Sequence, residues 1–91
     1  MVKCLLIFRV QTHLASSHEL FYKRSECPIT PFVGMLWELA PPLRYCTAVE
    51  HVRWYEGADY VEVISAVFQP QDYQDFARME SVLDANGWTR D

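Results

Sequence analysis

Three side chains that could do chemistry lie near the middle of the chain: Cys46, Glu50 and His51. A cysteine beside a histidine can act as a nucleophile. On one β-strand, however, residues 46 and 51 point to opposite faces, so Cys46 and His51 cannot share a site without a bulge between them. The sequence therefore assigns no catalytic residue, and we expect a non-enzymatic protein.

Glu50 is the one charged residue that we expect on the core face of its strand. A carboxyl group buried in a cleft is a candidate general acid or base, so Glu50 is a possible pocket acid. The alternative is that Glu50 lies near the end of the sheet, where it reaches solvent or pairs with a basic residue such as Arg44.

The sequence gives little support for a metal or cofactor site. Its three glycines are isolated, which excludes a glycine-rich phosphate loop, and there is no HExxH pattern. His13 and His18 could hold a metal only together with a carboxylate such as Glu19, and two loop histidines are more often simply solvated. We expect neither a metal nor a cofactor.

The strongest structural signal is a β-hairpin within residues 45–68. Two alternating runs flank residues 56–59, which supply turn residues. On the expected core face the pairs are Trp54 with Val61, Val52 with Val63, Glu50 with Ser65, and Ala48 with Val67. On the other face the pairs are Tyr55 with Tyr60, Arg53 with Glu62, His51 with Ile64, and Val49 with Ala66.

The second hairpin face is the candidate binding surface. Its binding residues are expected to be His51, Arg53, Tyr55, Tyr60 and Glu62. Tyrosine and arginine combine large contact area with hydrogen bonding, which suits an interface. The alternative is an ordinary solvent-facing side of an antiparallel sheet. In so small a chain, the simplest way to bury such a face is contact with a second copy of the same chain.

The remaining elements complete an α+β prediction. Val2–Gln11 is apolar on both alternating sets, which is typical of a strand buried on two faces. Residues 19–26 are expected to form a strand, although Ser16 and Glu19 have the form of a capping box that would begin a short helix. Residues 32–39 are expected to form a further short strand.

The C-terminal part predicts an amphipathic helix. Pro70 suits its first position, and Asn86-Gly87 suits its end, after which Trp88 can fold back. Its apolar stripe consists of Tyr73, Phe76, Met79, Val82 and Leu83. We therefore expect an antiparallel sheet of four to five strands with this helix packed on one face, the face of Val52, Trp54, Val61 and Val63.

Length and composition agree with one domain over residues 1–91. Apolar residues make up 51% of the chain, which excludes a disordered protein. The net charge of −4 disfavours a nucleic-acid binder, and the apolar run of residues 4–8 is too short to cross a membrane. A cytoplasmic protein is expected.

The three cysteines, Cys4, Cys27 and Cys46, are an odd number at wide spacing. Such spacing fits neither a disulfide framework nor a CxxC site. We expect them to be reduced and mostly buried, because free cysteine behaves as a small hydrophobe.

One pattern resembles a known group of proteins. It combines Pro28, Pro31, Phe32 and Gly34 with a strand Val49-x-x-Val52-x-Trp54 and a helix ending in Gly87-Trp88. This pattern is similar to that of small bacterial proteins carried by mobile gene cassettes and phages. Its motifs are structural, so the resemblance implies no activity and no functional residue.

Two main functions remain open from the sequence, beside a third class, nucleic-acid mimicry by the acidic C-terminal half. The first is a non-enzymatic interaction module that works as a homodimer, or as an adaptor or inhibitor of another protein. The alternative is a small-molecule-binding protein or enzyme of the dimeric α+β-barrel kind, with a pocket near Glu50 and His51. Such barrels have a βαββαβ order, so a helix within residues 17–26 would favour the alternative.

Overall fold

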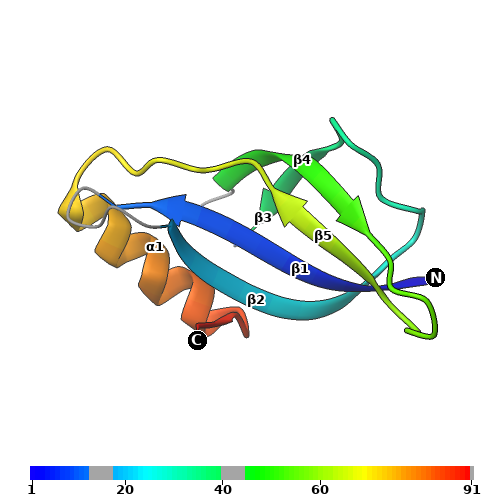
Figure 1. The fold of residues 1–91 in the computed structure, drawn as a ribbon. Coiled ribbons are helices and arrows are strands. Elements are labelled where there is room, and N and C mark those ends of the chain that lie inside the picture. The colour runs from blue at the N-terminus through cyan, green and yellow to red at the C-terminus, as the bar shows by residue number, and fades with distance from the viewer. Residues whose placement is uncertain (13–17, 40–44, 91) are drawn as a thin grey trace.

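The computed structural model describes residues 1–12, 18–39 and 45–90. These residues form an α+β fold of six strands and one helix (Figure 1). The elements are β1 (Val2–Gln11), β2 (His18–Cys27), β3 (Leu36–Leu39), β4 (Tyr45–Arg53), β5 (Val61–Ser65), α1 (Tyr73–Ala85) and β6 (Thr89–Arg90). The strand expected over residues 19–26 is confirmed as β2, whereas Ser16 of the competing capping box lies outside the described residues.

The strands form one curled, mixed sheet rather than an antiparallel sheet of four to five strands. Their order is β3-β4-β5-β1-β2-β6, and the sheet curls into a half-barrel (Figure 1). β1 pairs in parallel with β5, while the other neighbours are antiparallel. The central place of β1 agrees with its two apolar faces, which are typical of a strand with a parallel neighbour.

The core lies between the inner side of this sheet and α1. Cys4, Leu6, Phe8 and Val10 alternate along β1 and belong to one buried cluster with helix and sheet residues. Phe8 is fully buried, and its ring centroid lies 5.7 Å from that of Phe68 and 6.2 Å from that of Trp88. The helix thus closes the inner side near the C-terminal end of β1 (Figure 1).

The helix is confirmed, with a later start than Pro70. Asp72 is the N-cap, and its carboxylate accepts a hydrogen bond from the backbone N–H of Asp75 at 2.8 Å. Met79 and Leu83 are fully buried, whereas Tyr73 is 67% exposed and does not belong to the apolar stripe. Tyr73 is the first helical residue, so it lies at the end of the helix where little of the sheet can cover it.

The helix ends as expected. Gly87 has a φ of 87°, in the left-handed region that favours glycine. The backbone N–H of Trp88 then donates to the carbonyl of Leu83 at 3.0 Å, and Trp88 is buried. Folding back of Trp88 is therefore confirmed.

The expected burial of Trp54 and of the cysteines is also wrong. Trp54 is 58% exposed, because β4 ends at Arg53 and the indole N–H donates instead to the carbonyl of Ala58 at 2.9 Å. The cysteines are not mostly buried either. All three are free, but only Cys4 is buried, while Cys27 is half-buried and Cys46 is exposed near the start of β4. None of the described helices is long and apolar enough to cross a membrane.

Candidate binding face

The hairpin of β4 and β5 contains a β-bulge at Glu50. From His51 to Arg53 the pairing is as expected: His51 with Ile64, Val52 with Val63, and Arg53 with Glu62. The register then shifts, and Val49 rather than Glu50 pairs with Ser65. One extra residue on β4 therefore lies between two adjacent residues of β5.

This bulge corrects the assignment of Glu50 to the core. Val49 takes the inward position and is 3% exposed, whereas the side chain of Glu50 is 48% exposed. Glu50 is thus not a buried pocket acid, and its alternative partner Arg44 lies outside the described residues. The spacing of Val49 and Val52 is a signal for the bulge. Residues three positions apart on a regular strand point to opposite sides, so both valines can face the core only if β4 contains one extra residue between them.

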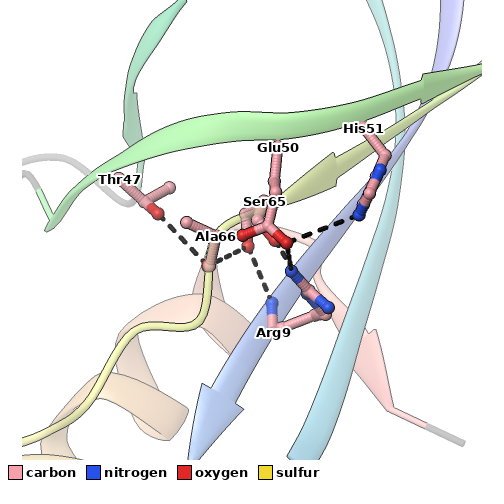
Figure 2. A network of polar contacts seen from close by, with 6 residues as sticks. All are labelled: Arg9, Thr47, Glu50, His51, Ser65 and Ala66. Carbon is pink, nitrogen blue, oxygen red and sulfur yellow. Dashed lines mark hydrogen bonds and ion pairs between the residues drawn. The ribbon is translucent and has the colours of Figure 1, made fainter. Parts of the chain in front are cut away.

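Glu50 contacts two basic side chains (Figure 2). Its Oε1 lies 3.0 Å from Nη2 of Arg9 and 3.4 Å from Nε2 of His51. Nη2 of Arg9 is shielded from solvent and has no hydrogen bond, so its contact with Glu50 is an ion pair without hydrogen-bond geometry. The arginine therefore depends on Glu50 to balance its charge.

Buried Ser65 holds Arg9 in place (Figure 2). The Oγ of Ser65 accepts a hydrogen bond from the backbone N–H of Arg9 at 2.9 Å and donates to the carbonyl of Ala66 at 2.8 Å. The Nε of Arg9 donates to the carbonyl of Ser65 at 2.8 Å. Sequence reasoning missed Arg9, although a charged residue on a strand apolar on both faces is a signal for a paired charge.

A second ion pair lies further along the same side of the sheet. Nε and Nη2 of Arg53 both donate to Oε1 of Glu62, at 3.2 and 3.1 Å, as the expected cross-strand pair requires. The guanidinium of Arg53 lies 5.5 Å from the ring centroid of Tyr55, and that of Arg24 lies 5.2 Å from the ring of Tyr60. Both distances are typical of cation–π contacts.

The two tyrosines are not a cross-strand pair, contrary to expectation. The ladder ends at Arg53 and Glu62, so Tyr55 and Tyr60 belong to the loop between the strands. Each tyrosine instead contacts an arginine from a different strand, β4 for Tyr55 and β2 for Tyr60. Both therefore lie at the end of the sheet where β4 and β5 are connected, Tyr55 beside Arg53 and Tyr60 beside Arg24.

These residues surround an apolar centre on the side of the sheet opposite the main core. Ile7 pairs with Tyr22 on one side and Ile64 on the other, and it is 8% exposed although it lies outside the main core cluster. We call this surface the outer face. It comprises Leu5, Ile7, Arg9, Tyr22, Arg24, Glu50, His51, Arg53, Glu62 and Ile64.

The structure thus brings His51, Arg53 and Glu62 together on the outer face and places Tyr55 and Tyr60 at its edge. Arg9 and Arg24 also lie on the outer face, although the sequence did not predict them as binding residues. Among the described residues, no group of three His, Cys, Asp or Glu side chains could hold a metal. His13 lies outside those residues.

A separate apolar cavity of about 200 Å³ lies on the inner side of the sheet. It is lined by Leu6, Ser25, Cys27, Pro31, Met35, Leu36, Trp37, Val49 and Val63. Neither Glu50 nor His51 contributes to its wall.

No protein-family model, curated protein or solved structure matches this chain. The resemblance to proteins of mobile gene cassettes therefore stays a prediction. What can be proposed about function depends on the residues of this chain alone.

Proposed function

We propose that the chain is a non-enzymatic interaction module that forms a homodimer through the outer face. The observation that carries this proposal is an apolar centre, made of half-buried Leu5 and Ile64 beside the buried Ile7, within a rim of paired charges on the side of the sheet away from α1. An apolar centre with a polar rim is the usual anatomy of a protein interface.

The charges of the rim favour a second copy as the partner. The rim has three basic residues, Arg9, Arg24 and Arg53, and two acidic residues, Glu50 and Glu62. Its net charge is therefore +1, whereas the net charge of the whole chain is −4. Two copies therefore repel each other less through this face than through the rest of the surface. A two-fold axis can also place each arginine opposite a glutamate of the partner, because the same patch is used twice.

Tyr55 and Tyr60 are the expected anchors of the interface. Tyr55 is 50% exposed, and each ring is already oriented by an arginine. Interface energy concentrates in such aromatic residues, since they bury a large area at low entropic cost.

Sedimentation equilibrium tests the proposal. We expect wild type to sediment at twice the chain mass of 10.7 kDa. The double variant Tyr55→Ser, Tyr60→Ser should sediment as a monomer with a nearly unchanged melting temperature, because both side chains lie outside the main core cluster. A matched control, Phe32→Ser with Tyr73→Ser, removes two exposed aromatics elsewhere and should remain a dimer.

Three results would contradict the proposal. Wild type that is a monomer at high concentration would exclude the homodimer. Equal masses for wild type and the tyrosine variant would exclude these anchors. An unfolded tyrosine variant would mean that the two residues belong to the folding core.

The alternative of a dimeric α+β barrel with a pocket near Glu50 and His51 gains no support. That fold requires a helix where this chain has strand β2. Glu50 is also exposed and engaged by Arg9. We do not propose this function.

A further inference from the structure

Two free thiols touch on the inner side of the sheet. Cys4 lies near the start of β1 and Cys27 at the end of β2, and their sulfur atoms are 3.2 Å apart. In the β1–β2 ladder Cys4 pairs with Ser25, two residues before Cys27. Because side chains alternate along a strand, Cys4 and Cys27 point to the same side.

The two thiols differ in access to solvent. Cys4 is 2% exposed, and its S–H donates to the sulfur of Cys27. Burial, with the adjacent Cys27 sulfur as a lesser cause, raises the pKa of Cys4 from 9.0 to about 12. Cys27 is half-buried and lines the apolar cavity, so a small reagent can reach Cys27 before Cys4.

We propose that Cys4 and Cys27 are a redox-active dithiol, which low-molecular-weight disulfides of the glutathione type oxidise to an intramolecular disulfide. This inference is independent of the proposed dimer, whose face lies on the other side of the sheet. It also departs from the expectation, drawn from the spacing of the cysteines, that all three stay reduced.

The reaction has two exchange steps. The thiolate of Cys27 attacks one sulfur of oxidised glutathione, the S–S bond of glutathione breaks, and one glutathione thiolate leaves. The sulfur of Cys4 then attacks Sγ of Cys27 and displaces the second glutathione, which takes the proton of Cys4. The protein loses two electrons and two protons, and one oxidised glutathione becomes two reduced ones.

The second step is favoured by proximity. The two sulfurs must approach from 3.2 Å to about 2.05 Å, a movement of roughly 1 Å. Because β1 and β2 pair over ten residue positions, the sulfurs are held near each other throughout. Such positioning makes the intramolecular step much faster than attack by a second glutathione.

The experiment uses the variant Cys46→Ser, which keeps only Cys4 and Cys27. The folded protein is incubated with oxidised glutathione, quenched in acid, denatured, alkylated and weighed by mass spectrometry. We expect a species two hydrogens lighter than the reduced protein, without alkylation and without glutathione. Its melting temperature should rise by roughly 10 °C, because the link constrains the unfolded chain.

Two matched variants test the order of the steps. With Cys4→Ser in addition to Cys46→Ser, the reaction should stop at a glutathione adduct on Cys27. With Cys27→Ser instead, the buried Cys4 should remain unmodified in the folded state.

Several outcomes would overturn the proposal. One is a Cys46→Ser protein that keeps two alkylatable thiols after prolonged oxidation. Another is accumulation of its glutathione adduct, which would mean that Cys4 cannot reach Cys27. Disulfides that form only between two chains, or an intramolecular disulfide that lowers the melting temperature, would show that the thiols are not adjacent in the native fold.

Discussion

The two sides of β1 differ in what covers them. On the inner side Phe8 and Val10 are fully buried and belong to the same cluster as Met79 and Leu83 of α1. On the outer side Ile7 is covered by its neighbours in the sheet and bounded by ion pairs. One strand thus contributes to a folding core on one side and to a candidate interface on the other. The difference teaches that an apolar strand face predicts burial, but not which elements provide it: a helix on the inner side, and neighbouring strands of the sheet on the outer side.

The largest expected effect tests whether the inner side is the folding core. Leu83→Ala should lower the free energy of unfolding by about 2–5 kcal/mol, because Leu83 is fully buried and its loss leaves a cavity. Urea denaturation gives the change. Tyr73→Ser, on the same helix but 67% exposed, is the control and should change the free energy by less than about 0.5 kcal/mol. Equal effects of the two substitutions would mean that α1 does not dock on the sheet through Leu83.

The bulge provides a sharper test, because it decides which residue faces each side. Val49→Ala should cost about 2 kcal/mol, since it removes buried methyl groups from a residue that is 3% exposed. Glu50→Ala, made in an Arg9→Ala background so that no shielded charge is left unpaired, should cost less than about 1 kcal/mol, since Glu50 is half exposed. In the unbulged register Val49 would face outward and Val49→Ala would cost little, so the same denaturation experiment distinguishes the two registers.

The sequence allowed most local elements to be predicted, and their local signals explain why. Strand β2, the helix with its Asn86-Gly87 end, and the Arg53–Glu62 pair each depend on residues that are close in the chain or joined by one turn. The parallel pairing of β1 with β5 was not predicted, because it joins strands separated by most of the chain. Strand β6 has only two residues and gives no periodicity to detect.

The candidate site was predicted less completely. The alternation of the hairpin was enough to place His51, Arg53 and Glu62 on one face. Arg9 and Arg24 come from β1 and β2, which reach this face only through the long-range order of the sheet. A single extra residue then moved Glu50 from one side to the other, because side chains alternate with a period of two.

The smallest expected effect concerns the ion pairs of the outer face. A double-mutant cycle with Arg53→Ala and Glu62→Ala should give a coupling of about 0.2–1 kcal/mol, near the upper end because the Glu62 side chain is only 14% exposed. The coupling should decrease as salt is added, since charges close to the surface are screened. Lys3 and Asp59 form the control pair: their charged atoms are 3.6 Å apart, but both side chains are well exposed, so their coupling should be close to zero. Both cycles are measured at a concentration where the protein is a monomer. If they give the same coupling free energy, burial beside the apolar centre does not strengthen the Arg53–Glu62 pair. The outer face would then be no different electrostatically from ordinary solvent-exposed surface.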